Sequence, residues 1–125
     1  MKFQPEKLSS DWVVHGYDEN GVLINGIRHQ SSLIFGSQLA PQAWEHASSD
    51  EMVLTPFEWL YKQCPKGTEV LLVGTGDKQV FPPIEIRRFF AQKNCPVEYM
   101  DTQAACRTYN ILVGEGRQVV AAIII

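Results

Sequence analysis

Two short segments of the sequence carry residue types suited to holding a small anion. Gly74-Thr75-Gly76 directly follows one apolar stretch, and Asp101-Thr102 follows another. Glycines let backbone N–H groups approach a ligand closely, and a helix beginning near Thr102 would offer unpaired N–H groups with a partial positive charge. Arg107 would lie about a turn and a half along that helix. The pattern predicts an anion pocket formed by Gly74, Thr75, Gly76, Asp101, Thr102 and Arg107.

The same residues also have a purely structural interpretation, which the sequence favours. Glycines often end strands, an aspartate often caps a helix, and an arginine often pairs with a carboxylate. A standard dinucleotide site would need a third glycine at position 79, where the sequence has Gln79, and a helix that opens directly from the loop. The sequence therefore argues against dinucleotide binding and leaves the anion pocket as an alternative.

Other reactive side chains form no complete catalytic set. Cys106 stands beside Arg107 near a helix N-terminus, where a thiol pKa can fall, but no histidine is near it in the sequence. Asp77 and Asp101 would act as an acid/base pair only if the fold brought them into contact. No metal and no cofactor is expected, because metal-ligand spacing is absent among the histidines, which are His15, His29 and His46.

Composition is typical of one soluble globular domain over residues 1–125, with 45% hydrophobic and 20% charged residues. A net charge of −3 with scattered arginines gives no basic footprint for nucleic acid.

The start of the chain has no apolar run typical of a signal peptide, and the three cysteines form no pairing motif, so we expect a cytoplasmic protein. The apolar run Val119–Ile125 is far shorter than the roughly 20 residues of a membrane helix, so no transmembrane segment is expected.

Turn residues separate short apolar runs in the first third of the chain. Asn20-Gly21 and Asn25-Gly26 are both suited to type I′ hairpin turns, so residues 12–35 are predicted to form an antiparallel β-meander. Residues 36–50 are predicted to be a short edge strand or a loop. A helix is then predicted with Thr55 as its cap and Pro56 at its first position.

The second half alternates strands and helices in the manner of parallel βαβ units. Residues 69–73 read as a strand buried on both faces, and Pro82-Pro83 opens the next helix. Residues 96–100 read as a strand, Asp101 or Thr102 caps a helix that runs to about Val113, and residues 118–124 form the last strand. An α/β fold follows, with an antiparallel meander before the parallel units.

Several long motifs occur in order along the chain. They are Leu72-Val73-Gly74-Thr75-Gly76, Phe81-Pro82-Pro83, Met100-Asp101-Thr102, residues 104–110 and Glu115-Gly116-Arg117. With them, nearly the whole sequence resembles a family of small uncharacterised bacterial and archaeal proteins that also contains the mitochondrial complex I (NADH dehydrogenase) assembly factor 3. The resemblance implies a three-layer α/β fold with a mixed central sheet, in which the last strand runs antiparallel, and it supplies no catalytic residues.

Two functions follow from these observations. The leading prediction is a non-enzymatic protein-interaction or complex-assembly module with an unknown protein partner, because no catalytic set is complete and the family includes an assembly factor. The alternative is a protein or enzyme that binds a small anionic ligand at the strand ends near Gly74–Gly76 and Asp101–Arg107.

Overall fold

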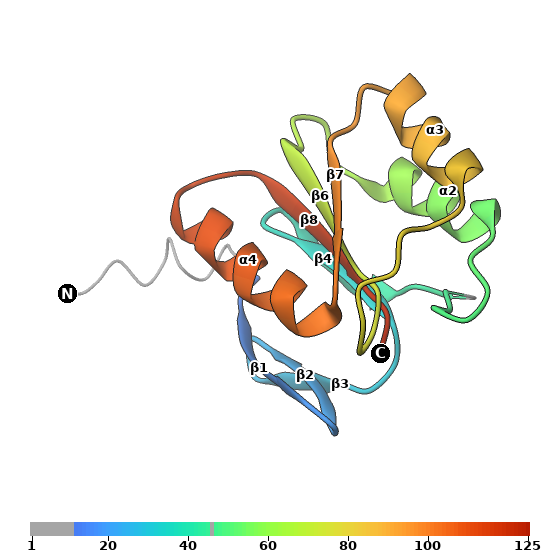
Figure 1. Ribbon diagram of the computed structural model, residues 1–125. Helices are drawn as coiled ribbons and strands as arrows, with labels where there is room; N and C mark the ends of the chain where they lie inside the picture. The colour runs from blue at the N-terminus through green and yellow to red at the C-terminus, as the bar shows by residue number, and fades with distance from the viewer. Residues whose placement is uncertain (1–11, 46) are drawn as a thin grey trace.

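The computed structural model describes residues 12–45 and 47–125, which form two sheets and several helices (Figure 1). A three-stranded sheet has the order β1-β2-β3, and a five-stranded sheet has the order β5-β4-β8-β6-β7. The elements are β1 (Val14–Asp18), β2 (Gly21–Ile24), β3 (Ile27–His29), β4 (Leu33–Gly36), β5 (Leu39–Ala43), α2 (Leu54–Gln63), β6 (Val70–Gly74), α3 (Ile84–Gln92), β7 (Val97–Met100), α4 (Thr102–Gly114) and β8 (Val119–Ile123).

The three-stranded sheet is the antiparallel meander that the turn dipeptides predicted. Its second turn is Asn25-Gly26, and both residues have the positive φ of a type I′ turn, 46° and 88°. The first turn is Glu19-Asn20 rather than the predicted Asn20-Gly21, since Gly21 already pairs within β2. Gly21 is needed for another reason: its φ is +112°, and a Cβ there would lie 2.1 Å from the carbonyl oxygen of His29.

The meander prediction was wrong for its last apolar run. Leu33–Gly36 forms β4 of the five-stranded sheet, antiparallel to both β5 and β8. All four residues of β4 are buried, so the strand needs a covering layer on each face, which a two-layer arrangement with the small sheet could not provide. The predicted edge strand in residues 36–50 is confirmed as β5.

The second half forms the predicted parallel units, since β6 pairs in parallel with both β7 and β8. The last strand, β8, lies at the centre of the sheet and runs antiparallel only to β4. The antiparallel direction implied by the family resemblance therefore holds for one neighbour of β8 and is wrong for the other. The mixed central sheet is confirmed.

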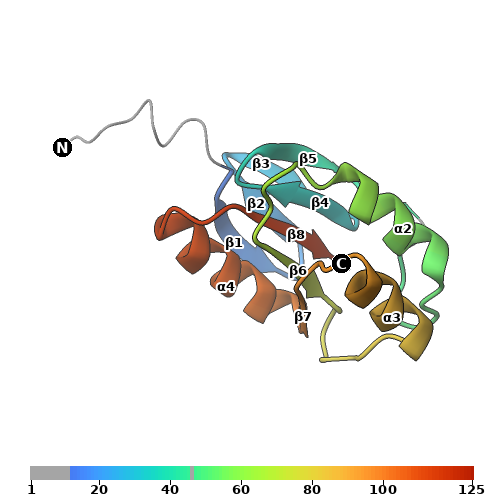
Figure 2. The same ribbon diagram turned by 90° about the horizontal axis from the view of Figure 1, so that it is seen from above.

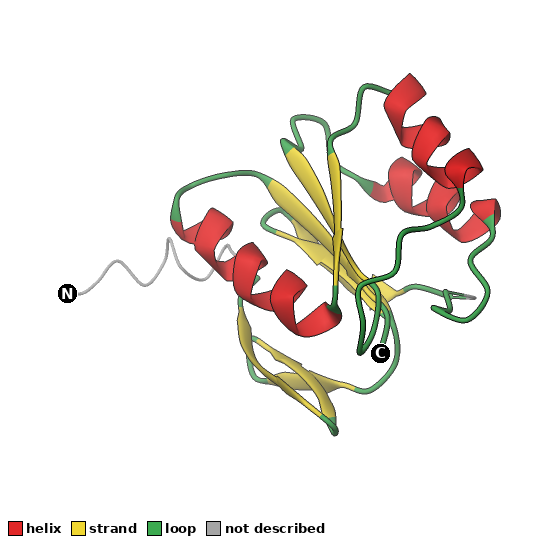
Figure 3. Ribbon diagram, viewed as in Figure 1, coloured by secondary structure: helices red, strands yellow, loops and turns green. Residues whose placement is uncertain are grey.

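Layers form on both faces of this sheet, as Figure 3 shows. In Figure 2, α4 and the small sheet cover one face while α2 and α3 cover the other. Successive side chains of a strand point to opposite faces of the sheet, so one buried strand contributes side chains to both layers. In β6, for example, Leu72 packs on the α4 side, and its neighbours Leu71 and Val73 pack on the α2/α3 side.

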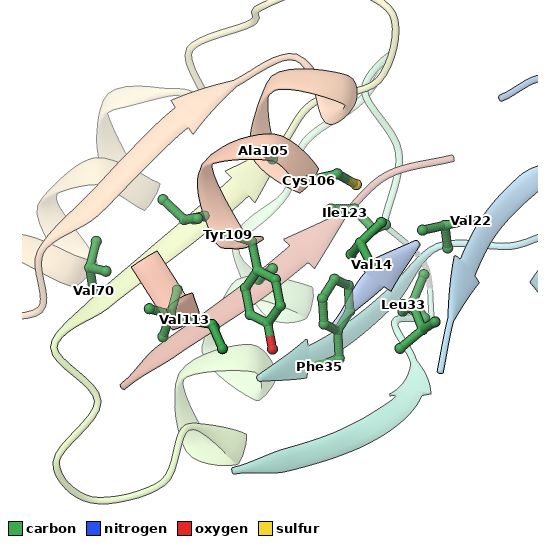
Figure 4. Packing of buried hydrophobic residues seen from close by; sticks show 14 residues of the cluster. Val14, Val22, Leu33, Phe35, Val70, Ala105, Cys106, Tyr109, Val113 and Ile123 are labelled. Atoms are coloured by element: carbon green, nitrogen blue, oxygen red, sulfur yellow. The ribbon is translucent and has the colours of Figure 1, made fainter. Parts of the chain in front are cut away.

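Aromatic rings pack edge-on in the core on each face of the sheet. On the α4 side, shown in Figure 4, Tyr109 packs edge-on against Phe35 at 4.8 Å between ring centroids. On the other side the rings continue in a chain, in which Phe57 packs edge-on against both Trp44 and Phe90. Edge-on packing of this kind adds stability beyond the burial of apolar area.

Helix ends agree with the sequence in two cases and differ in one. The Asp101 side chain caps α4, accepting a hydrogen bond from the backbone N–H of Ala104 at 2.8 Å, as predicted. Pro83 directly precedes α3, also as predicted. Helix α2 begins one residue before Thr55, with Val53 at the cap position and no side-chain cap bond. Pro56 is accepted in this first turn because backbone N–H groups there have no partner within the helix.

Candidate functional site

The loops after β6 and β7 lie side by side, as the predicted anion pocket requires. The backbone N–H of Thr75 donates to the carbonyl of Met100 at 2.8 Å, and that of Thr102 donates to the carbonyl of Gly76 at 2.9 Å. Parallel pairing of β6 and β7 causes this meeting, because it brings the carboxyl ends of both strands to the same edge. Gly74–Gly76 and Asp101–Thr102 are thus neighbours in space.

The polar groups of these loops are nevertheless engaged inside the protein. The Thr102 hydroxyl donates to the carbonyl of Ile124 at 2.7 Å and accepts from the backbone N–H of Gly76 at 2.8 Å. The Thr75 hydroxyl donates to the carbonyl of Lys78 and accepts from the backbone N–H of Val80 at 3.0 Å. Both threonines are buried. Together they tie the ends of β6, β7 and β8, a structural role that uses the donors an anion would need.

Gly74 also has a structural reason to be glycine. A Cβ at this position would lie 2.9 Å from Cα of Thr102 and 3.1 Å from a methyl carbon of Ile123. Any side chain would therefore push α4 away from the strand ends. Gly76 has a φ of +94°, the left-handed region in which glycine is favoured, because the loop turns there.

Arg107 lies on the exposed side of α4, in a groove between that helix and β1. We name this the β1/α4 groove; its volume is about 220 Å³. It is lined by Val14, His15, Gly16, Tyr17, Gln103, Cys106, Arg107 and Asn110. The structure thus joins five of the six predicted residues at the strand ends and places Arg107 in an adjoining groove. Anion binding there stays a prediction.

Cys106 also lines the β1/α4 groove, but its thiol is poorly suited to nucleophilic chemistry. Burial raises the pKa of Cys106 to about 12, against a smaller lowering effect of the Arg107 charge. At neutral pH the side chain is therefore a neutral thiol. The pKa of Tyr17 across the groove is raised as well, by burial and by the nearby charges of Asp77 and Asp101.

Two residues that the sequence analysis did not single out hold β1 against α4. The Asn110 side chain pairs with both backbone groups of Val14: it accepts from the N–H at 3.0 Å and donates to the carbonyl at 2.6 Å. The Tyr109 hydroxyl donates to the carbonyl of Trp12 at 2.5 Å. Asn110 therefore bonds Val14 as a residue of a neighbouring strand would, at the start of β1. The only sequence signal for this role was that both residues belong to one of the family motifs.

A second concave surface lies where β5 ends and α2 begins. We name it the β5/α2 groove; its volume is about 540 Å³, and its lining residues are Ala43, Glu45, Val53, Thr55, Pro56 and Trp59. Val53 is 47% exposed there. The indole N–H of Trp44 donates to the carbonyl of Pro56 at 3.1 Å, which holds the chain after β5 against the start of α2. No local sequence pattern indicates this groove, because its walls come from separate elements.

Within residues 12–45 and 47–125, no group of three or more histidine, cysteine, aspartate or glutamate side chains is placed to hold a metal ion. No helix in this part of the chain has the length and apolar character needed to cross a membrane.

Comparison with known proteins identifies the family. A family model described as "Protein of unknown function (DUF498/DUF598)" matches residues 14–124. The chain belongs to this family. The resemblance drawn from the motifs is confirmed, since proteins named complex I assembly factor 3 are among the relatives.

Three similar proteins carry different names. The chain is 46% identical to the "13 kDa major membrane protein" of Francisella tularensis, with 99% of each sequence covered. It is 32% identical to the "NADH dehydrogenase [ubiquinone] 1 alpha subcomplex assembly factor 3" of Xenopus tropicalis, where 95% of this chain matches 64% of that protein. A crystal structure of a Bordetella parapertussis protein is 33% identical, with a TM-score of 0.81 over 90% of this chain and 94% of that one. The chain thus spans less than two thirds of the assembly factor.

Proposed function

We propose that this protein is a non-enzymatic interaction or complex-assembly module and that it binds a protein partner in the β5/α2 groove. The observation that carries the proposal is the groove itself, an open hollow of about 540 Å³ with an apolar floor. Exposed apolar surface in a concave site is typical of a binding surface. The similarity to proteins named assembly factors supports the same function.

The lining residues indicate the chemistry of the partner. Pro56, Val53 and the half-buried Trp59 would contact an apolar side chain, while Glu45 places a carboxylate at the same groove. A partner segment with one apolar anchor beside a lysine or arginine would match both features. The net charge of −3 of the chain favours approach of such a basic segment.

Strand β5 borders the groove and is the outermost strand of the main sheet on this side. Pro41 lies within β5 and lacks a backbone N–H, which makes the strand a poor template for a continuous ladder of hydrogen bonds. We therefore expect the partner to be held by side chains inserted into the groove, and not by addition of a strand.

The test is a matched pair of arginine substitutions at exposed apolar positions. Val53→Arg places a charge in the groove, whereas Ile111→Arg places the same charge on α4, where Ile111 is 61% exposed. We expect a protein that copurifies with the tagged full chain from the native host to bind at least about tenfold more weakly to Val53→Arg, because a charge would be buried against the anchor. Binding to Ile111→Arg should equal that of the wild type.

Two results would contradict the proposal. One is equal retention of the partner by both variants, which would place the binding surface elsewhere. The other is elution of the wild-type chain alone at its native concentration. A circular dichroism melt of each variant checks that folding is unchanged, as expected for exposed positions.

Anion binding or catalysis at the strand ends is the second candidate function. The observation in its favour is that Arg107, His15 and Tyr17 line one groove beside the two predicted loops. Loss of phosphate binding in Arg107→Ala, measured by amide chemical shifts during a phosphate titration, would support this function.

We further propose a cytoplasmic location for the chain, on the basis of its sequence. The name of the Francisella relative, a major membrane protein, makes this worth testing directly. Recovery of the protein in a salt-washed membrane fraction would contradict the proposal.

A further inference from the structure

A third groove lies where α2 and α3 end, and it is unlike the other two in charge. Figures 1 and 2 show these helices side by side on one face of the sheet. The groove has a volume of about 370 Å³ and is formed by the last turn of α2, the segment 64–68 after it and the segment 93–96 after α3. We name it the lysine groove, because Lys62, Lys66 and Lys93 line it.

Positive charge is concentrated there to an unusual degree. These are three of the four lysines that the structure describes, and the fourth, Lys78, is not a lining residue. No aspartate or glutamate lines the groove. Among the described residues, no carboxylate oxygen lies within 4.0 Å of any of the three ammonium groups. The lysine groove is thus a locally cationic hollow in an acidic chain, and its ammonium groups form no ion pair with a carboxylate of the described residues.

The surroundings reduce this charge but do not cancel it. The C-terminal ends of α2 and α3 each contribute roughly half a negative charge, which together offset about one of the three lysine charges. Cys64 and Cys95 also line the groove, and burial raises the pKa of both thiols, that of Cys64 to about 12. Both are therefore neutral near pH 7 and add no negative charge.

Aromatic rings position one of the lysines. The ammonium of Lys93 lies 5.8 Å from the ring centroid of Tyr61 and 5.6 Å from that of Phe89. The two rings pack edge-on against each other at 5.7 Å. Contacts of this kind attract a cation to the ring faces. Lys93 is thereby held near the groove, and Tyr61 offers apolar surface to the organic part of a ligand.

The loop on the other side is held by its own hydrogen bonds. The hydroxyl of Thr68 donates to the carbonyl of Pro65 at 2.7 Å, and the backbone N–H of Thr68 donates to the same carbonyl at 3.2 Å. Gly67 between them has a φ of +90°. This turn holds the backbone on either side of Lys66 at one wall of the groove.

We propose that the lysine groove binds a small phosphate-bearing anion, with the ammonium groups of Lys62, Lys66 and Lys93 around the phosphate. Net positive charge of about two matches the charge of a phosphate monoester near pH 7 and exceeds that of a single carboxylate. Lysine side chains bind phosphate as point charges and need no fixed planar geometry. The phosphate could belong to a soluble phosphate ester or to the headgroup of an anionic phospholipid, and the experiment separates the two sources.

The experiment titrates the full chain with inorganic phosphate and with phenyl phosphate at low ionic strength, followed by amide chemical shifts. We expect the largest shifts at Gly67, Thr68 and Asn94, which line the groove. Each single lysine-to-alanine substitution should weaken binding about fivefold, as expected for one exposed ion pair. The triple variant, with Lys62, Lys66 and Lys93 all changed to alanine, should not bind phosphate. Added salt should weaken binding to the wild type.

Lys78→Ala is the matched control, because it removes the same charge outside the groove and should leave the affinity unchanged. Vesicles of phosphatidylcholine with and without phosphatidylglycerol form the second arm. Cosedimentation only with the anionic vesicles, lost in the triple variant, identifies a lipid headgroup as the source. Binding of phenyl phosphate without cosedimentation identifies a soluble ester.

Three outcomes would overturn the proposal. The first is the absence of any shift in the wild type with millimolar phosphate or phenyl phosphate and no cosedimentation. The second is unchanged binding in the triple variant. The third is loss of binding in Arg107→Ala with retention in the triple variant, which would place the anion in the β1/α4 groove. None of these results depends on the partner proposed for the β5/α2 groove.

Discussion

The two faces of the main sheet are held in different ways. On the α4 face, side chains bond to backbone groups far away in the sequence, as the buried Thr102 does with Ile124 and the half-buried Asn110 does with Val14. On the α2/α3 face, aromatic rings pack edge-on in a continuous series. The first kind of contact fixes direction and distance, and the second mainly fills space.

The grooves on the two faces also differ in volume. The β1/α4 groove has a volume of about 220 Å³, whereas the lysine groove and the β5/α2 groove have about 370 and 540 Å³. Side-chain bonds from α4 hold Val14 at the start of β1, whereas the two larger grooves lie at the start of α2 and at the ends of α2 and α3. Both binding surfaces proposed above therefore lie on the α2/α3 side.

The largest effect is expected from breaking the aromatic series. Phe57 is 2% exposed and contacts Trp44 and Phe90, so Phe57→Ala should reduce the free energy of unfolding by about 3–5 kcal/mol. Urea unfolding followed by circular dichroism measures the change. Phe81→Ala is the control, since Phe81 is 63% exposed and its removal should cost under about 1 kcal/mol. Equal losses in both variants would mean that the series does not hold this face.

A smaller but still large effect is expected from the α4 face. Thr102→Val keeps the size of the side chain but removes the bonds to Gly76 and Ile124, and we expect a loss of about 2–3 kcal/mol because buried partners are left unpaired. Thr108→Val makes the same change at a half-buried position of α4. It should be nearly neutral in urea unfolding. A neutral Thr102→Val would show that packing alone secures this face.

The smallest effect is expected from a polar contact at the surface, where the side chains are exposed. The backbone N–H of Gln118 and the guanidinium of Arg117 bond to the Glu69 carboxylate and lower its pKa. A lowered pKa in the folded state stabilises the protein above the ordinary glutamate pKa, and this stabilisation is lost as the pH falls through the folded-state value.

Glu69→Gln should therefore be less stable than the wild type at about pH 7, with the difference shrinking towards about pH 3. Thermal unfolding at both values measures it. Because Glu69 is exposed, the difference should be much smaller than that for Thr102→Val. A difference that stays constant with pH would show that the carboxylate charge is not the cause.

Much of the fold could be predicted because its signals are local. The Asn25-Gly26 turn, the Asp101 cap and the buried strand before Gly74 each depend on a few adjacent residues. The candidate site was predicted less well. The two loops were expected to lie side by side if their strands were neighbours, and they do, but the sequence could not show that Thr75 and Thr102 would bond to each other's loops and leave Arg107 in a separate groove.

The sequence by itself determined most of the strands and helices, since periodicity, turn residues and caps act over a few positions. Only the tertiary structure decided that β4 joins the main sheet, that Asn110 pairs with a residue 96 positions away, and that Lys62 and Lys93 face one groove. The physical reason is that these contacts depend on how the layers pack, and the type of a residue does not specify which distant residues it will contact. The family membership and the proposed grooves thus rest on different information, the first on motifs and the second on packing.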